Sequence, residues 1–317
     1  RQCVLGRETA IQKMVWNKEG WLRLAYGGRF GQWETEEPTG IQEYLFPEEE
    51  GKDYGRDDFD IKITDCAGKD KIAENADTAE ASSEIKEHMN ENHVVGSGSD
   101  KKSGASAQKT SANLDVRYTS LRHPYDSYTS LTERPGYLRL YGQESLNSCY
   151  NVSLVARRQQ ERHVQVETCV EFTPTCREQM AGLAYMYDTG NFYLLVKTRE
   201  EEFGSQTLDL KKSAKLRLIK SDHFDVEDVI PAISIPEDGP VYLRVTTTQE
   251  GLYAKFFYSL DGNDYQELAE VPTNILTDEQ SDGFTGAHFG MYCHDMTGVR
   301  RYADFDYFQI VKACKEQ

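Results

Sequence analysis

The chain has 317 residues, with 53 acidic against 36 basic side chains and a formal net charge of −17 at pH 7. This charge excludes the basic footprint that nucleic acid or an anionic membrane surface requires, so neither is an expected partner. No apolar run in the sequence approaches the ~20 residues of a membrane-spanning helix. The length favours two ordinary domains over one large domain, and a neutral ligand remains open.

Residues 1–28 predict a β-hairpin. The turn residues 17–20 separate two strand-like runs, GRETAIQKMVW and WLRLAYGG, with Trp16 and Trp21 beside the turn, where they can pack across the pair. Two strands alone bury too little apolar surface to be stable in water, so we expect their sheet partners to lie in sequence outside this chain. The first residue is Arg1, and no initiator methionine or signal peptide is visible, which indicates the later part of something longer.

Residues 29–57 have the composition of a linker. They carry proline, glycine and an acidic run, which favour an exposed connection over a packed element. The sequence DFDI at residue 58 starts a new strand. We therefore expect a domain boundary in this stretch and a second domain over residues 58–317.

The second domain contains a stretch without aromatic residues, from Ile61 to Arg117. Ser, Ala, Lys, Glu and Gly dominate it, and such a composition cannot bury enough apolar surface to offset chain entropy. We therefore expect a disordered insertion at about residues 66–113. Since metal binding needs a folded scaffold, His88 and His93 inside it are expected to be solvated.

The rest of the second domain predicts antiparallel sheet. In HVQVETCVEF, residues 163–172, apolar and polar side chains alternate, which is typical of a half-buried strand. Residues 182–187 and 192–197 are two aromatic and aliphatic runs, separated by turn residues at 188–191. Further strand-like runs follow at a spacing of roughly 8 to 12 residues, as in a sandwich or jelly roll. The fold class is therefore expected to be all-β.

The seven cysteines show no metal-binding spacing. They are Cys3, Cys66, Cys149, Cys169, Cys176, Cys293 and Cys314. Buried free thiols are the favoured interpretation, and a Cys169–Cys176 disulfide is the alternative. Asn151 begins a glycosylation sequon, which matters only in a secreted protein, and the compartment stays open.

Two carboxylate pairs are candidates for acid/base chemistry. Glu167 and Glu171 lie on one strand face, and Asp304 and Asp306 on another, each among ordinary polar neighbours. Solvated strand faces or local salt bridges are favoured over catalysis. The 19 tyrosines and 13 phenylalanines fit both a sandwich core and sugar stacking, with the core favoured.

Several segments resemble the carboxyl-terminal part of glycoside hydrolase family 43 enzymes of the β-xylosidase type. The resemblance is carried by LGRETAIQKMVW with GWLRL, DFD, YTSLR with PGYLRLYGQESL, SLVARRQQ, ETCVEFTP, MAGLAYMYDTGNFYLL, GFTGAHFGMYCHD and ADFDYFQIV. These segments occur in colinear order and cover nearly everything except residues 29–57 and the insertion.

The resemblance implies a five-bladed β-propeller that carries the active site, followed by a concanavalin-like β-sandwich (jelly roll). Residues 1–28 would then be the last strands of the propeller, and residues 58–317 the sandwich. This arrangement explains why the opening hairpin lacks sheet partners.

Enzymes of this family remove terminal xylose, or in some cases arabinose, from xylo-oligosaccharides with inversion. The three catalytic carboxylates of these enzymes belong to earlier blades of the propeller. The resemblance therefore implies that this chain holds no catalytic residue and is inactive by itself. The implied partners are the missing N-terminal propeller and a xylo-oligosaccharide or arabinoxylan-derived substrate, while homo-oligomer formation stays open.

Two residues match the family's substrate site. Arg7, in the GRET motif, resembles an arginine of the terminal-sugar subsite, and its structural alternative is a blade-closing salt bridge. Phe284, in DGFTGA, resembles an aromatic residue on a sandwich loop that closes over the propeller pocket, and its alternative is simple interface packing. No cofactor or metal site is expected, because a structural calcium ion has no supporting ligand cluster.

A noncatalytic carbohydrate-binding module is the alternative function, since concanavalin-like sandwiches often bind glycans on a concave face. A purely structural sandwich that stabilises its propeller is a third interpretation. The sequence does not distinguish a preference for xylose from one for arabinose.

Overall fold

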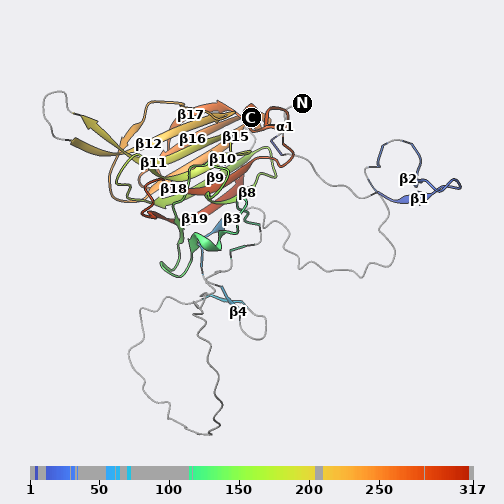
Figure 1. The fold of residues 1–317 in the computed structure, drawn as a ribbon, viewed down its shortest axis with the longest axis horizontal. Helices are drawn as coiled ribbons and strands as arrows, with labels where there is room; N and C mark the ends of the chain where they lie inside the picture. Colours follow the sequence, from blue (N-terminus) through green and yellow to red (C-terminus); the bar gives the residue numbers. More distant parts are fainter. Residues whose placement is uncertain are drawn as a thin grey trace, which may run out of the picture.

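The computed structural model describes residues 4–5, 12–28, 30–32, 34, 55–60, 62–64, 70–72, 114–115, 117–203, 210–281 and 283–313. Two large antiparallel sheets dominate this part of the chain, and two small two-stranded sheets accompany them (Figure 1). The predicted all-β sandwich is therefore confirmed.

The seven-stranded sheet consists, in hydrogen-bonded order, of β13 (Asp225–Asp228), β12 (Leu210–Asp222), β11 (Phe192–Phe203), β10 (Gln179–Met186), β18 (His288–Asp295) and β8 (Ser153–Arg158), with β14 (Ile233–Ile235) paired to β12. The eight-stranded sheet consists of β17 (Gln266–Pro272), β16 (Tyr253–Ser259), β15 (Val241–Thr248), β9 (Val164–Glu171), β19 (Tyr302–Lys312), β7 (Leu138–Tyr141) and β6 (Thr129–Ser130), with β3 (Gly55–Asp57) paired to β19. The small sheets are β1 (Met14–Trp16) with β2 (Leu22–Leu24), and β4 (Lys62–Thr64) with β5 (Asp70–Ile72).

The described helices are short. They are η1 (Tyr125–Ser127), η2 (Gln249–Gly251), η3 (Asn274–Leu276) and α1 (Asp278–Ser281). None of them is long and apolar enough to cross a membrane.

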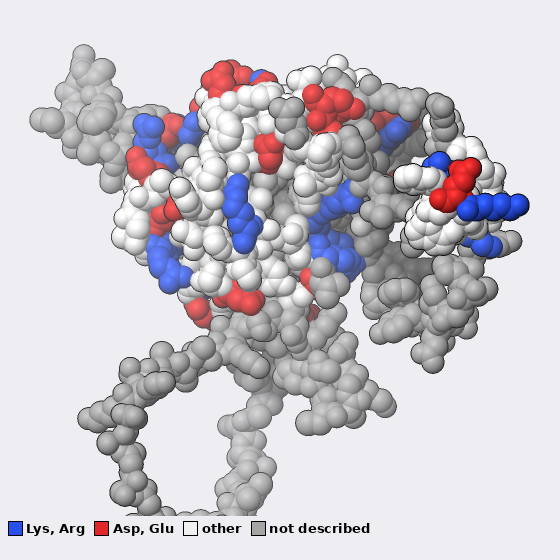
Figure 2. All heavy atoms as spheres, turned by 45° about the vertical axis from the view of Figure 1, so that its right-hand side comes forward, with Lys and Arg blue, Asp and Glu red and all other residues white. Residues whose placement is uncertain are grey.

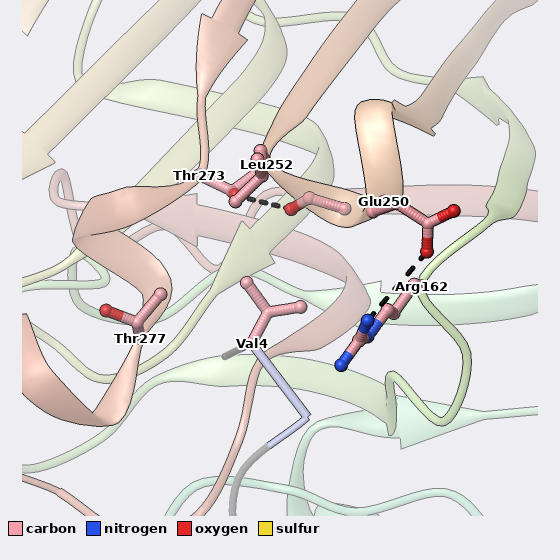
Figure 3. Close-up of a pocket in the computed structure, with 7 residues that line it drawn as sticks. Val4, Arg162, Glu250, Leu252, Thr273 and Thr277 are labelled. Carbon is pink, nitrogen blue, oxygen red and sulfur yellow. Dashed lines mark hydrogen bonds and ion pairs between the residues drawn. The ribbon is translucent and has the colours of Figure 1, made fainter. Parts of the chain in front are cut away.

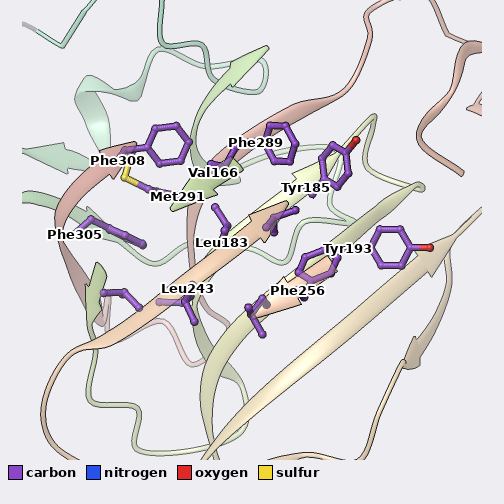
Figure 4. Packing of buried hydrophobic residues seen from close by; sticks show 14 of the residues in the cluster. Val166, Leu183, Tyr185, Tyr193, Leu243, Phe256, Phe289, Met291, Phe305 and Phe308 are labelled. Carbon is purple, nitrogen blue, oxygen red and sulfur yellow. The ribbon is translucent and has the colours of Figure 1, made fainter. Parts of the chain in front are cut away.

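The main hydrophobic core lies between the two large sheets (Figure 4). The eight-stranded sheet contributes Val166, Leu243 and Phe256, and the seven-stranded sheet contributes Tyr185 and Phe289, all fully buried. The last two rings stack with centroids 4.1 Å apart and an interplanar angle of 12°. Because each such side chain stabilises the fold by about 1.5–3 kcal/mol when buried, this layer holds the sandwich together.

A second apolar cluster covers the other face of the seven-stranded sheet. Ala184 on β10 and Val196 on β11 are fully buried and belong to this cluster, together with Leu146 and Val152 from the segment before β8. Both faces of β10 and β11 are therefore buried. This explains why their sequences are continuous apolar runs instead of alternating ones.

The alternation predicted for residues 163–172 is confirmed on the inward face of β9, where every residue is buried. Of the two interpretations given for Glu167, the solvated strand face is wrong, because the residue is 9% exposed, and the local salt bridge is confirmed. Cys169 is 2% exposed, as the buried-thiol interpretation predicted. Glu167 accepts a hydrogen bond from the Tyr307 hydroxyl and another from Arg244 Nε at 2.7 Å. Side chains of the neighbouring strands therefore cover the outer face, and the ion pair makes burial of the carboxylate tolerable.

The predicted opening hairpin is confirmed as β1 and β2, with Trp16 opposite Leu22. The Asn17 side-chain oxygen accepts hydrogen bonds from the backbone N–H groups of Glu19 at 3.1 Å and Trp21 at 2.8 Å, which fixes the turn. The two tryptophans remain 72% and 62% exposed. Among the described strands, β1 and β2 pair only with each other, and the hairpin is seen apart from the sandwich in Figure 1.

Most of the predicted linker, residues 29–57, and of the predicted insertion, residues 66–113, lies outside the described residues, His88 and His93 included. Two short strands fall within these stretches. β5 pairs with β4, and β3 pairs with β19 in the eight-stranded sheet. The sheet therefore includes residues that precede the expected domain start at residue 58.

The described cysteines are all free thiols. The alternative of a Cys169–Cys176 disulfide is wrong, because Cys169 lies within β9 between Tyr242 of β15 and Tyr307 of β19, whereas Cys176 lies in the loop that follows β9. Burial raises the pKa of the Cys169 thiol to about 12. The buried-thiol interpretation holds for Cys169 and Cys293, and fails for the exposed Cys149. Cys3, Cys66 and Cys314 lie outside the described residues.

A buried histidine gives the fold a pH-dependent stability. His294 on β18 is 6% exposed, and its Nδ1 lies 2.6 Å from the Tyr292 hydroxyl. Burial disfavours the charged imidazolium and lowers the pKa of His294 from an ordinary 6.5 to about 4. The unfolded chain therefore binds a proton at a higher pH than the folded chain does, and the free energy of unfolding falls as the pH falls from about 6.5 towards 4.

We expect a His294→Gln variant to lose this pH dependence. Between pH 7 and pH 5, the free energy of unfolding of the wild type should fall by about 2 kcal/mol more than that of the variant. Urea denaturation at pH 7 and pH 5 measures the free energy of unfolding. The matched control is His123→Gln, at an exposed histidine. Equal pH dependence of the wild type and His294→Gln would contradict the assignment.

Candidate functional site

The first described residues attach to one end of the sandwich. The backbone oxygen of Val4 accepts a hydrogen bond from the N–H of Ala287 at 2.6 Å, and the Val4 side chain is 4% exposed within the main core. The backbone oxygen of Leu5 accepts a hydrogen bond from the Arg158 guanidinium. Although the hairpin forms its own sheet, the residues that precede it are therefore anchored in the sandwich.

A cavity of about 220 Å³ lies beside Val4 (Figure 3). It is lined by Val4, Arg162, Glu250, Gly251, Leu252, Thr273 and Thr277. Arg162 and Glu250 form an ion pair at 3.8 Å, and the Thr273 hydroxyl donates a hydrogen bond to the Gly251 oxygen at 2.6 Å. Among the described residues, this lining contains a single carboxylate, Glu250, and not the carboxylate pair of a glycosidase. The cavity lies between Val4 and η2.

Phe284 lies close to the same end, in the loop between α1 and β18, and its side chain is 64% exposed. The backbone on both sides of it lies against Tyr187, which directly follows β10. The Thr285 N–H donates a hydrogen bond to the Tyr187 hydroxyl at 3.2 Å, and a Cβ on Gly283 would lie 2.6 Å from a ring carbon of Tyr187. The loop therefore presents Phe284 on a rigid support.

The Tyr187 hydroxyl is itself held in place. It donates a hydrogen bond to the Asp278 carboxylate on α1. Burial and this hydrogen bond raise the pKa of Tyr187 to about 12, so the hydroxyl keeps its proton and can donate to Asp278 while accepting from Thr285. Sequence reasoning missed this support because its contacts join residues 91 and 98 positions apart.

Arg7, the other predicted site residue, lies outside the described residues. It follows the described residue Val4 by three positions in the sequence. Phe284 precedes Ala287 by three positions, and Ala287 is bonded to Val4. Val4 and Ala287 therefore meet at one end of the sandwich, while the sugar contacts expected of Arg7 and Phe284 stay predictions.

The two carboxylate pairs lie in salt bridges. Glu171 accepts hydrogen bonds from Arg134 at 2.9 and 3.0 Å, and Asp304 accepts them from Arg139 at 2.7 and 2.9 Å. The favoured interpretation of local salt bridges is confirmed for these two residues.

Among the described residues, no group of three His, Cys, Asp or Glu side chains could hold a metal ion. On the face shown in Figure 2, basic side chains are scattered among acidic and uncharged ones.

Comparison with known proteins places these features in a family. The family described as Beta xylosidase C-terminal Concanavalin A-like domain matches residues 110–311. A β-xylosidase of Bacillus subtilis (strain 168) is 31% identical over 314 residues, which cover 97% of this chain and 46% of that protein. Xylosidase/arabinosidase 43B of Humicola insolens is 27% identical over 314 residues, covering 97% of this chain and 47% of that protein.

Among solved structures, the xylan β-1,4-xylosidase of Bacillus halodurans C-125 superposes with a TM-score of 0.69 at 30% sequence identity, covering 98% of this chain and 48% of that chain. The present chain therefore spans about half the length of the relatives that it matches.

The support of the Phe284 loop gives a direct prediction. Tyr187→Phe removes the acceptor of the Thr285 N–H, so the amide of Thr285 should exchange with solvent about tenfold faster, equivalent to a lost hydrogen bond of about 1–1.5 kcal/mol. Hydrogen exchange followed by NMR measures this rate. Tyr193→Phe, which removes a hydrogen bond to the Pro272 oxygen, is the control that should leave Thr285 unchanged. An unaltered exchange rate in Tyr187→Phe would show that the hydroxyl does not hold the loop.

Proposed function

Because the chain belongs to the family of β-xylosidase C-terminal concanavalin A-like domains, we propose that it is the C-terminal part of a glycoside hydrolase that releases terminal xylose, or arabinose, from xylo-oligosaccharides with inversion. The proposal rests mainly on how much of the chain matches these relatives. Two relatives with xylosidase names align with 97% of the chain, the hairpin included, and each continues for about as long again.

The hairpin supports the assignment of residues 1–28 to the end of a propeller. Met14 and Trp16 on β1 lie opposite Leu24 and Leu22 on β2, so their side chains share one face. Met14, Trp16 and Leu22 are 41%, 72% and 46% exposed. An apolar two-stranded sheet needs further strands or a packing partner, and the last blade of a catalytic propeller would supply both.

We propose that the catalytic groups of this reaction lie outside this chain. An inverting glycosidase places an acidic and a basic carboxyl group about 6.5–9.5 Å apart across the scissile bond, and it needs no cofactor. The carboxylates Glu167, Glu171 and Asp304 are committed to arginine partners. We therefore assign the catalytic carboxylates to the N-terminal propeller of the full-length enzyme and expect this chain alone to be inactive.

Arg7 and Phe284 are the proposed contributions of this chain to the substrate site. The guanidinium of Arg7 would hold the hydroxyls of the terminal sugar, because its fixed donors suit two neighbouring oxygens. Phe284 would close the pocket so that only short substrates enter end-on. The junction of Val4 with Ala287 supports both roles, since it joins the two segments at the end where a preceding propeller connects.

Arg7→Ala in the full-length enzyme should lower kcat/KM for xylobiose by about 2–4 kcal/mol, or roughly 30- to 1000-fold, because a charged contact to the substrate is lost. Steady-state kinetics measures the loss. Arg177→Ala, at an arginine whose side chain is 80% exposed, should leave kcat/KM unchanged. Wild-type kinetics in Arg7→Ala would remove Arg7 from the site.

Phe284→Ala should lower kcat/KM for xylobiose at least about tenfold, because an aromatic contact worth about 1.5–3 kcal/mol is lost. The open pocket should also admit branched xylo-oligosaccharides that the wild type rejects. Product analysis by chromatography tests the second effect. Tyr150→Ala, at a tyrosine that is 71% exposed before β8, is the control. If Phe284→Ala has wild-type kinetics and product pattern, the residue serves only interface packing.

A further inference from the structure

A second cavity lies at the opposite end of the sandwich from Val4 and Phe284. β9 starts beside Arg162, which lines the cavity at Val4, and ends at Glu171, which lines this one. A strand of this length spans about 20 Å or more, so the two cavities are well separated. The second has a volume of about 300 Å³ and is lined by Arg134, Glu171, Phe172, Thr173, Gly239, Arg301, Tyr302 and Asp304.

The charged groups of this cavity are held in fixed positions. Asp304, which is 5% exposed, accepts hydrogen bonds from Arg139 Nε at 2.7 Å and from Arg134 at 3.2 Å. Glu171 accepts from both terminal nitrogens of Arg134, at 2.9 and 3.0 Å. Arg301 Nε donates to the Thr173 oxygen at 2.8 Å. Planar donors and acceptors are therefore arranged before any ligand arrives.

Tyrosine rings flank these groups. The guanidinium carbon of Arg134 lies 3.5 Å from the ring centroid of Tyr137, and that of Arg139 lies 3.8 Å from the centroid of Tyr302. Tyr302 is still 44% exposed and lines the cavity. A partly exposed aromatic ring beside fixed polar groups can pack against the C–H face of a sugar. The volume of this polar cavity is at the lower end of the range of about 300–1000 Å³ for small-molecule sites.

The net charge of the residues that line the cavity indicates which class of ligand it can bind. Two arginines and two carboxylates line the cavity, so it carries no formal excess charge. A divalent cation would have to displace guanidinium groups from Glu171 and Asp304, and a phosphate would have to displace carboxylates from Arg134. A neutral polyhydroxyl compound can instead donate hydrogen bonds to the remaining lone pairs of the carboxylates and accept them from the remaining N–H groups of the arginines. Its C–H face can then pack on Tyr302.

We propose that the cavity formed by Arg134, Glu171, Tyr302 and Asp304 binds one or two units of a neutral saccharide, as a site separate from the proposed active site. The choice of a xylo-oligosaccharide as ligand rests on the proposed function of the full-length enzyme. Weak binding here would raise the effective concentration of a long chain near the propeller without entering the chemical step.

The test is titration of the 317-residue chain with xylotriose, followed by NMR and calorimetry, since the chain itself is expected not to hydrolyse this probe. We expect saturable binding with a dissociation constant of about 1 mM or weaker. Tyr302→Ala should weaken binding about tenfold, while Tyr302→Phe, which keeps the ring beside Arg139, should retain it. Tyr253→Ala, at a tyrosine of β16 that is 37% exposed, is the control for a general loss of surface aromatic area.

Absence of saturable binding, or equal binding by Tyr302→Ala and the wild type, would overturn the proposal. Glu171→Gln separates ligand recognition from packing, because it preserves the side-chain shape and should still weaken binding. Hydrolysis of an aryl xyloside by the full-length enzyme distinguishes this proposal from the proposed function. Tyr302→Ala should leave that hydrolysis unchanged. If the full-length enzyme has no xylosidase activity but its sandwich still binds xylotriose, the proposed xylosidase function is disproved and the saccharide site at Tyr302 is retained.

Discussion

The arrangement of the molecule depends on the attachment of Val4 to the sandwich. Its buried side chain and its hydrogen bond to Ala287 fix the chain at the start of β18, immediately after the loop that carries Phe284. Without this attachment, the hairpin and the sandwich would be two unrelated bodies on one chain. With it, Val4 and the loop that carries Phe284 share one end of the sandwich, which is the end where the proposed substrate pocket would be completed.

The other end of the sandwich is organised by ion pairs instead of apolar contact. Arg134 and Arg139 hold Glu171 and Asp304 in hydrogen bonds of 2.7–3.2 Å, above a sheet whose inward face is closed by Phe305. Carboxylates tied in this way have a structural role, because guanidinium groups already occupy part of their hydrogen-bonding capacity. The two ends therefore differ in their chemistry: an apolar attachment lies at one end and a network of ion pairs at the other.

Much of the fold could be predicted because its signals are local. The alternation in β9, the turn at Asn17 and the turns between later strands each lie within about ten residues, and all were found in the structure. β3 could not be predicted, because three residues are too few to show a period, and its place in the sheet comes from pairing with β19, whose Tyr307 ring packs under Arg56 at 3.7 Å. The burial of Glu167 was missed for a similar reason, since the side chains that cover it come from other strands.

The candidate site was less predictable than the fold. Arg7 and Phe284 were proposed from family resemblance, and nothing in their local sequence reveals that the neighbouring backbones meet. The bracing of the loop by Tyr187, and the cavity at Tyr302, arise from contacts between distant strands, so only coordinates could reveal them.

The central claim, that this chain completes the sugar pocket of a longer glycosidase, is tested most directly by a crystal structure of the full-length enzyme with bound xylose. The account predicts that nitrogen atoms of the Arg7 guanidinium lie about 3 Å from sugar hydroxyls and that the Phe284 ring is within about 4.5 Å of the ligand. A sugar bound in the propeller with both side chains far from it would contradict the account.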